Sequence, residues 1–417
     1  MEIDIETIDR MGGYNPYQLT WGEEIMFPST RKLTEYGNRI YNRYPARSIF
    51  LVPRAILSQY RNQGIKVLDP FMGSGTTAVE TLISGNTPIG VEMDPFARLI
   101  AEVSSTVFNE EDFVMLNNVS VKILRRWNAY KPAPIPQLVG ITRWFKDNDL
   151  EKLLRLKSCI NAMTPPKYLP FMMVAFADCI KPVSLMERQS LKPYISKKHP
   201  KITKEVIDSF IYSYNAHLDA IKQMTEVAMP TNIEWIGEDA TNFRTESSCI
   251  DIAITSPPYI NALDYTRCVK IEGAMCDCID DEIASDMRYV QVGHENRKNK
   301  DIDDIVLNTF RPWYDQILSK DRSRANTCMA YFNDIYKNLI CVYQALKVNG
   351  EYHIIIGDNT IKKIEVPTHK IIASLAESVG YNWFGYYKYQ IKDHRTSIPR
   401  NNVKNKIQYE YVLMLKK

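Results

Sequence analysis

The sequence predicts an α/β fold built around a mostly parallel sheet, and three observations support it. Residues 66–84 read as a strand, a glycine-rich turn and a helix. A second short apolar run, 88–94, ends in acidic residues, as a neighbouring parallel strand would. Two apolar and aromatic runs close the chain, 381–391 and 407–415, and favour a terminal antiparallel pair of strands.

The glycine-rich turn after Asp69 has the composition of a ligand cradle. Gly73 and Gly75 permit positive φ angles and let a ligand lie directly against the backbone. In doubly wound sheets an acid at the end of the second strand accepts hydrogen bonds from ribose hydroxyls, which makes Glu92 the first candidate and Asp94 the second. The turn lacks the third glycine of a dinucleotide site and the Gly-Lys-Ser/Thr of a triphosphate site, which disfavours both ligands.

A second motif, Thr-Ser-Pro-Pro-Tyr, ends a buried-strand pattern that begins at residue 251. Pro257 and Pro258 remove two N–H donors and fix φ, so nearby carbonyls are held as acceptors. Ser256 Oγ and the Pro257 carbonyl could accept the N–H groups of a planar amine, while Tyr259 stacks on its ring. An isolated Pro-Pro usually only ends a strand beside a core tyrosine, but its place after a cofactor-like half favours function. We call residues 256–259 the clamp.

The remaining elements follow in chain order. We expect a helix over 331–347 that ends at Asn349-Gly350, a buried strand over 351–357 and a helix over 367–379. The long middle segment reads as amphipathic helices, most clearly over 150–156, 168–180 and 202–229.

Four segments together resemble the amino-group DNA methyltransferases, which methylate N4 of cytosine or N6 of adenine. Residues 69–77 resemble motif I of that family, residues 44–50 its motif X and residues 235–240 its motif III, and the clamp resembles its catalytic motif. The resemblance implies a Rossmann-like class I methyltransferase fold: a mostly parallel seven-stranded sheet with a terminal antiparallel hairpin, here with a helical insertion.

The resemblance also implies S-adenosylmethionine as cofactor and a metal-free, direct transfer to an amine nitrogen of a flipped base. The catalytic residues would be Ser256, Pro257, Pro258 and Tyr259. The residues expected to bind the cofactor are Tyr44, Pro45, Ala46, Asp69, Pro70, Phe71, Gly73, Ser74, Gly75, Thr76, Thr77, Glu92, Met93, Asp239 and Ala240.

Serine at the first clamp position favours cytosine N4, since Thr-Ser-Pro-Pro-Tyr occurs mostly in the cytosine enzymes of this family. Adenine N6 stays open, because both bases present an amine conjugated to a ring. Two further alternatives are an RNA base methyltransferase and a catalytically inactive subunit that binds nucleic acid. The intact turn and clamp argue against the inactive subunit.

The expected organisation is a catalytic domain formed by 1–104 and 231–417, with 105–230 as a helical insertion and candidate target-recognition region. A helical cap that serves only stability is the alternative for the insertion. The expected partners are double-stranded DNA and, in a restriction-modification or related system, a companion endonuclease on another chain. The net charge of +3 is too small for global attraction to DNA. The clustered basic residues expected to bind DNA are Arg188, Lys192, Lys197, Lys198, Arg297, Lys298, Arg395 and Arg400.

The composition indicates the cellular location and the state of the cysteines. No apolar run approaches the roughly 20 residues that cross a membrane, and the acidic start is unlike a secretory signal. We therefore expect a soluble cytoplasmic protein of a prokaryote or phage, without a membrane partner. The eight cysteines include Cys268, Cys276 and Cys278 but lack Cys-x-x-Cys spacing, which favours reduced thiols over a zinc site.

Overall fold

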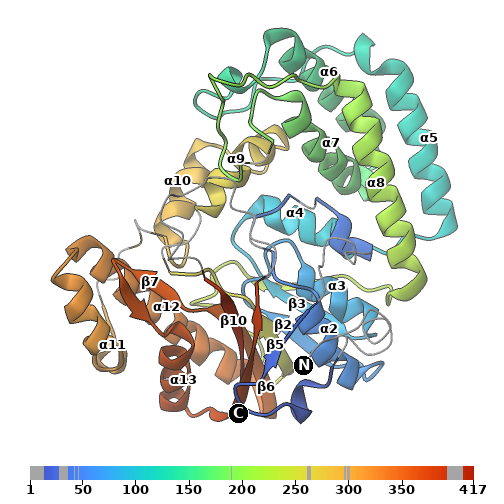
Figure 1. The fold of residues 1–417 in the computed structure, drawn as a ribbon. Coiled ribbons are helices and arrows are strands. Elements are labelled where there is room, and N and C mark those ends of the chain that lie inside the picture. The colour runs from blue at the N-terminus through green and yellow to red at the C-terminus, as the bar shows by residue number, and fades with distance from the viewer. Residues whose placement is uncertain are drawn as a thin grey trace.

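The protein is described by a computed structural model that covers residues 14–27, 36–41, 43–45, 47–188, 190–260, 264–294, 297, 301–391 and 407–417. A large twisted sheet with helices on both faces forms one half, and a helical insertion stands over one edge of it (Figure 1). The strands in spatial order are β4 (Glu234–Gly237), β3 (Thr87–Val91), β2 (Lys66–Asp69), β5 (Ile250–Thr255), β6 (Leu346–Gly357), β10 (Tyr409–Lys416), β9 (Asn382–Gln390) and β1 (Glu24–Ile25).

The sheet confirms the predicted architecture and adds one strand to it. Strands β4, β3, β2, β5 and β6 are parallel, and β10 runs antiparallel to both of its neighbours. The sheet has eight strands instead of the expected seven because β1 pairs in parallel with β9, where Glu24 lies opposite Lys388. A two-residue strand gives no periodic signal in the sequence, so β1 was not predicted.

The turn between β2 and the following helix, α3 (Thr76–Ile83), depends on glycine. Gly73 and Gly75 have φ angles of +53° and +87°, which other residues rarely adopt. A Cβ on Gly75 would approach Ala101 Cα to 2.9 Å. Gly75 therefore lets α3 pack closely against α4 (Pro95–Ser104), which Asp94 caps by accepting from the Phe96 backbone N–H.

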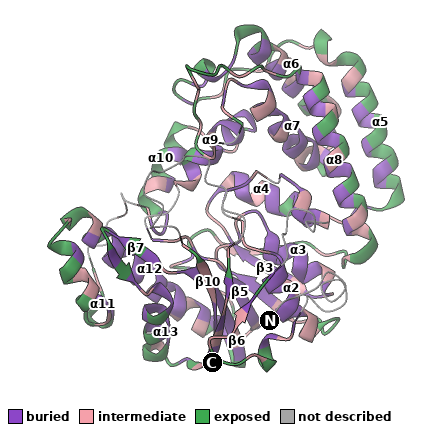
Figure 2. Ribbon diagram, in the orientation of Figure 1, coloured by how far each residue is buried: buried purple, intermediate pink, exposed green. Residues whose placement is uncertain are grey.

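Helices cover the two faces of the sheet with separate hydrophobic cores (Figure 2). Helices α12 (Arg322–Ala345) and α13 (Thr368–Val379) pack on one face, and α2 (Leu51–Leu57) packs on the other. The expected helix over 331–347 is longer at its start and ends earlier, because Leu346 is already buried in β6 opposite Ile250. The turn at Asn349-Gly350 thus lies inside a strand. Two short strands that were not predicted, β7 (Asn359–Ile361) and β8 (Ile364–Val366), form a separate hairpin.

The insertion is helical, as predicted, but its core extends beyond it. Its helices are α5 (Glu110–Arg126), α6 (Asp147–Met163), α7 (Leu169–Val183) and α8 (Val206–Val227). The same buried cluster includes Phe96 and Ile100 of α4, and Ile271 and Met275 of α9 (Tyr265–Met275). Because α9 follows the clamp in the chain, the insertion is packed directly to the catalytic half. Helices α10 (Asp281–Val290) and α11 (Asp304–Leu318) complete the segment after the clamp.

Within the described ranges, no helix has both the length and the hydropathy needed to cross a membrane. All eight cysteines are free thiols. The described part of the chain contains no group of three or more His, Cys, Asp or Glu side chains arranged around a common metal position.

Candidate functional site

Asp69 joins the glycine-rich turn to the clamp. Strands β2 and β5 are parallel neighbours, so their carboxyl ends lie at one edge of the sheet. There Thr255 Oγ1 donates to Asp69 Oδ1 at 2.6 Å, and Thr77 Oγ1 donates to Asp69 Oδ2 at 2.6 Å. The Phe71 N–H also donates to Asp69 Oδ1, at 3.0 Å. Both carboxylate oxygens are thus engaged inside the protein, and Asp69 positions the turn and the clamp relative to each other.

Glu92 and Asp94 place two more carboxylates beside the turn. Glu92 Oε2 accepts from the Gly73 N–H at 2.7 Å, and Oε1 accepts from the Asp94 N–H at 2.9 Å. Asp94 uses Oδ1 to cap α4, while its buried Oδ2 has no hydrogen-bond partner among the described residues. Burial raises the pKa of Glu92 to about 7 and the pKa values of Asp69 and Asp94 to about 6.

The space over the turn suits a ligand that brings donors or positive charge. A Cβ on Gly73 would lie in ordinary van der Waals contact with Tyr44 Cε1, at 3.7 Å, so no atom presses on the backbone at this position. No described Lys, Arg or His forms an ion pair with Asp69, Glu92 or Asp94, although burial makes their charged forms unfavourable. S-adenosylmethionine carries ribose hydroxyls, an ammonium and a sulfonium, and these residues therefore fit it.

The other expected cofactor residues vary in position. Asp239 is exposed and accepts from the Thr241 N–H at 2.8 Å and from Thr241 Oγ1 at 2.7 Å. Ala46 lies outside the described residues. The buried members of the expected set are Tyr44, Pro45, Pro70, Ser74, Gly75, Thr76, Thr77 and Ala240, and the half-buried members are Phe71, Gly73 and Met93. For the whole set, cofactor contact stays a prediction.

The clamp is anchored by a residue that the sequence did not identify. The Tyr259 hydroxyl donates to Glu410 of β10, and the Tyr389 hydroxyl donates to the other oxygen of the same carboxylate. Burial, reinforced by the negative charge of Glu410, raises the pKa of Tyr259 well above its ordinary value, so its hydroxyl stays protonated and donating. No described residue hydrogen-bonds the half-buried Ser256 hydroxyl, which leaves it available to a substrate.

Tyr331 is a second residue near the clamp that sequence reasoning missed. Its hydroxyl is buried on α12 and has no hydrogen-bond partner among the described residues. A Cβ on Gly293 would meet both the Tyr259 carbonyl oxygen, at 2.8 Å, and Tyr331 Cδ2, at 3.5 Å. Tyr331 therefore lies next to the clamp, although only a long-range contact between α12 and the segment after the clamp reveals it.

The expected DNA contacts are only partly placed. The described part of the 184–205 segment exposes Arg188, Lys192, Lys197 and Lys198 to solvent. Arg297 is different, because its side chain is only 11 % exposed and its guanidinium donates to the fully buried Asp334. This internal ion pair does not favour Arg297 as a DNA contact. The other expected DNA contacts, Lys298, Arg395 and Arg400, lie outside the described residues.

The raised pKa values predict that the ligand-free protein loses stability as the pH rises. Between the ordinary value of 3.8 or 4.5 and the raised value near 6 or 7, each acid holds more protons in the folded state than in the unfolded chain. Rising pH therefore lowers the free energy of unfolding, by about 1–3 kcal/mol for each of the three groups. Urea unfolding at pH 5 and pH 7.5 measures this difference in the free energy of unfolding.

The sharpest variant for this prediction is Asp94→Asn. Asn caps helices as well as Asp does, so the substitution keeps the cap of α4. The amide group replaces Oδ2, which has no hydrogen-bond partner in the described structure, so we expect the fold to be preserved. We expect a smaller loss of stability with pH than in the wild type, whereas the exposed control Asp286→Asn should keep the full loss. An Asp94→Asn protein with the unaltered pH dependence would contradict the assignment.

Comparison with known proteins gives matches to methyltransferases, most of them DNA or type II enzymes. A family model for N6 and N4 enzymes, described as DNA methylase, matches residues 13–102. Type II methyltransferase M.MvaI of Kocuria varians is 25 % identical over 93 % of this chain and 92 % of its own. Type II methyltransferase M.AvaI of Nostoc sp. is 22 % identical over 86 % of this chain and 81 % of its own. Among solved structures, the rRNA methyltransferase aviRa of Streptomyces viridochromogenes covers 89 % of this chain and 86 % of its own at 10 % identity, with a TM-score of 0.31.

Proposed function

This chain belongs to the amino-group DNA methyltransferase family, and from that premise we propose that it methylates N4 of cytosine at a specific site in double-stranded DNA. Its cofactor is S-adenosylmethionine. The preference for cytosine rests on the Thr-Ser-Pro-Pro-Tyr form of the clamp. We further propose a role in a restriction-modification system, with the endonuclease on a separate chain.

The observation that carries the proposal is the pair of hydrogen bonds that Asp69 accepts. Thr77 is the second residue of α3, the helix after the glycine-rich turn, and Thr255 immediately precedes the clamp. Because both donate to one carboxylate at 2.6 Å, the expected cofactor turn and the expected amine acceptors are held together at one sheet edge. Catalysis by positioning two reactants requires such a rigid connection.

Each clamp residue then has a distinct task. S-adenosylmethionine, when bound, supplies a methyl group on a positively charged sulfur. Ser256 Oγ and the Pro257 carbonyl accept the two N–H groups of the base amine and so orient its nitrogen. Tyr259 stacks on the ring, with its orientation fixed by Glu410. Glu92 accepts from ribose hydroxyls beside the turn, where burial has already raised its pKa.

The base must leave the duplex to reach the clamp, so we propose that it is flipped out. A flipped base enters a site that already presents unpaired polar groups. The Ser256 hydroxyl and the buried Tyr331 hydroxyl both lack partners among the described residues. We propose that residues 105–230 contribute to recognition of the target sequence, since the insertion packs on α9 directly after the clamp.

The deciding experiment identifies the modified nucleoside. The purified protein is incubated with methyl-labelled S-adenosylmethionine and unmodified DNA, with RNA in parallel, and the products are digested and analysed by mass spectrometry. We expect N4-methylcytosine from DNA, and at least a hundredfold lower rate for Ser256→Ala with cofactor binding retained. N6-methyladenine would correct the base, and label in RNA alone would overturn the proposal.

A further inference from the structure

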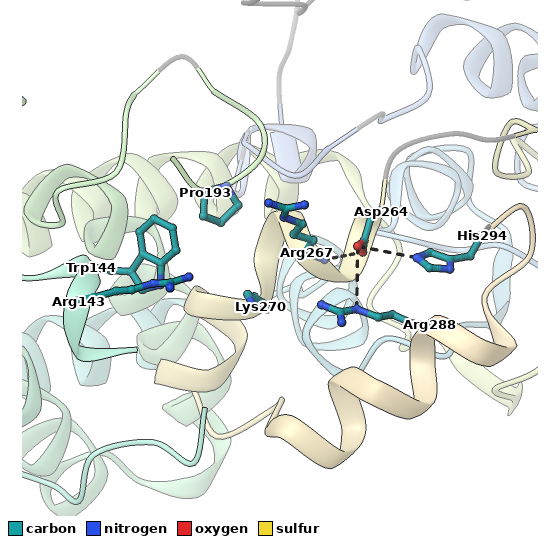
Figure 3. A pocket seen from close by; sticks show the side chains of 8 residues that line it. All are labelled: Arg143, Trp144, Pro193, Asp264, Arg267, Lys270, Arg288 and His294. Carbon is teal, nitrogen blue, oxygen red and sulfur yellow. Dashed lines mark hydrogen bonds and ion pairs between the residues drawn. The ribbon is translucent and has the colours of Figure 1, made fainter. Parts of the chain in front are cut away.

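A basic pocket lies where the insertion meets the segment after the clamp. It encloses about 310 Å³ (Figure 3). The insertion supplies one wall, and α9, α10 and the residues that follow α10 supply the other, so the pocket exists only where the two regions meet. The lining residues are Arg143, Trp144, Pro193, Asp264, Arg267, Lys270, Arg288 and His294.

The four cations in this pocket are poorly neutralised. Within the described structure, the side chains of Arg143, Arg267 and Lys270 form no hydrogen bond or ion pair, and the Arg143 guanidinium lies over the Trp144 ring at 4.8 Å. Arg288 Nε is buried without a hydrogen-bond partner among the described residues, 4.0 Å from Asp264 Oδ2. Burial lowers the pKa of Lys270, and repulsion from the three arginines lowers it further.

Asp264 carries the one carboxylate among the described lining residues, and it is already shared. Asp264 Oδ1 caps α9 by accepting from the Arg267 backbone N–H at 2.8 Å. Asp264 Oδ2 lies 3.8 Å from His294 Nε2 as well as 4.0 Å from Arg288 Nε (Figure 3). Among the described lining residues, one acid therefore faces four cations, which leaves an excess of positive charge that an anion from outside would balance.

The pocket is connected to the clamp through the backbone. Gly293, at φ +79°, packs so closely that a Cβ would come within 2.8 Å of the Tyr259 carbonyl oxygen, and His294 follows it. On the other side, Asp264 caps α9, whose first residue is Tyr265. Burial raises the pKa of Tyr265, and the nearby Cys268, Glu410 and Glu92 raise it further. The basic pocket is thus adjacent to the proposed base site, as the sugar-phosphate backbone of a flipped nucleotide would be.

We propose that the basic pocket binds a backbone phosphate of the DNA strand that carries the target base. Arginine matches phosphate because its planar fork donates two parallel hydrogen bonds, and lysine adds a point charge. Contacts of this kind fix the position of the protein on DNA without reading sequence. The inference rests on the proposed function, since it requires DNA as substrate.

The test measures how DNA affinity depends on salt. A short duplex that contains the site methylated by the enzyme is titrated with protein over a range of salt concentrations. The proteins compared are the wild type, Lys270→Gln, Arg267→Gln and a triple variant that combines both substitutions with Arg288→Gln. We expect about three- to tenfold weaker binding for each single variant, and for the triple variant a salt slope lower by about 1. Arg125→Gln is the matched control, because it is exposed on α5 at the outer side of the insertion (Figure 1).

Asp264→Asn should change DNA affinity in the opposite direction. Asn keeps the cap of α9 while one negative charge leaves the pocket, so DNA binding should tighten and its salt slope should steepen. An unchanged salt slope in the triple variant would overturn the inference, because it would mean that the pocket does not contact DNA. A loss of affinity confined to one DNA sequence would also overturn it, in favour of base recognition. Methylation assays at saturating DNA separate failure of this inference from failure of the proposed function. If only the inference fails, the triple variant still methylates the site; if the proposed function fails, even the wild type leaves DNA unmodified.

Discussion

Tyr259→Ala should lower kcat/KM for DNA methylation by roughly a hundred- to a thousandfold. Stacking of a base on an aromatic ring contributes about 1–3 kcal/mol, and an unstacked base would also be less well oriented for transfer. Cofactor affinity should change little, because we propose that Tyr259 contacts the base and that the cofactor binds at the turn. Single-turnover methylation and calorimetric titration of S-adenosylmethionine measure the two effects separately.

Glu410 allows the stacking and the anchoring of Tyr259 to be separated. Tyr259→Phe keeps the ring but loses the hydrogen bond to Glu410, so we expect a loss of only about three- to tenfold. Tyr389→Phe is the matched control: it removes the other donor to the same carboxylate, and it should reduce stability with less effect on methylation. Equal activity of Tyr259→Ala and the wild type would rule out stacking on Tyr259.

The sequence was sufficient to predict the order of the main strands and helices. Strong local signals were responsible, such as the glycines of the turn, the proline-terminated strand and the apolar run of β6. The predicted terminal pair was also confirmed, with Tyr411 opposite Lys388 across β9 and β10. Elements without periodicity were missed, because β1 has only two residues and β7 and β8 have three each.

The partners of the site residues could not be predicted in the same way. Glu410 lies 151 positions after Tyr259, and nothing in its local sequence distinguishes it from other acids in strands. The basic pocket was missed for a similar reason: Arg143 and Arg267 belong to no dense basic run, and only packing of α9 against the insertion brings them together. Conversely, Arg297 belongs to a basic run but is held by the buried Asp334. Charge density in sequence is therefore a poor guide to which cations are free.

Asp69→Ala should have the largest effect on stability, destabilising the protein by about 2–4 kcal/mol. Two buried hydroxyl donors, of Thr77 and Thr255, and the part-buried Phe71 N–H lose their acceptor, at about 1–3 kcal/mol each. Burial raises the pKa of Asp69 to about 6, and removal of this buried acid offsets part of the loss. The loss of three hydrogen bonds costs more than removal of one buried carboxylate gains, so we expect net destabilisation. Urea unfolding at pH 7.5 gives the magnitude.

Thr255→Val tests whether Asp69 also connects the turn with the clamp. Valine has nearly the same shape but no hydroxyl, so the variant removes one donor to Asp69 and should cost about 1–2 kcal/mol. Because Thr255 precedes Ser256 directly, we expect slower methylation at saturating cofactor and DNA. Thr81→Val is the matched control, since its hydroxyl donates to the Thr77 carbonyl within α3, away from the clamp. If the role of Asp69 is purely structural, Thr255→Val lowers stability but leaves kcat unchanged, as Thr81→Val does. A connecting role lowers kcat in Thr255→Val alone.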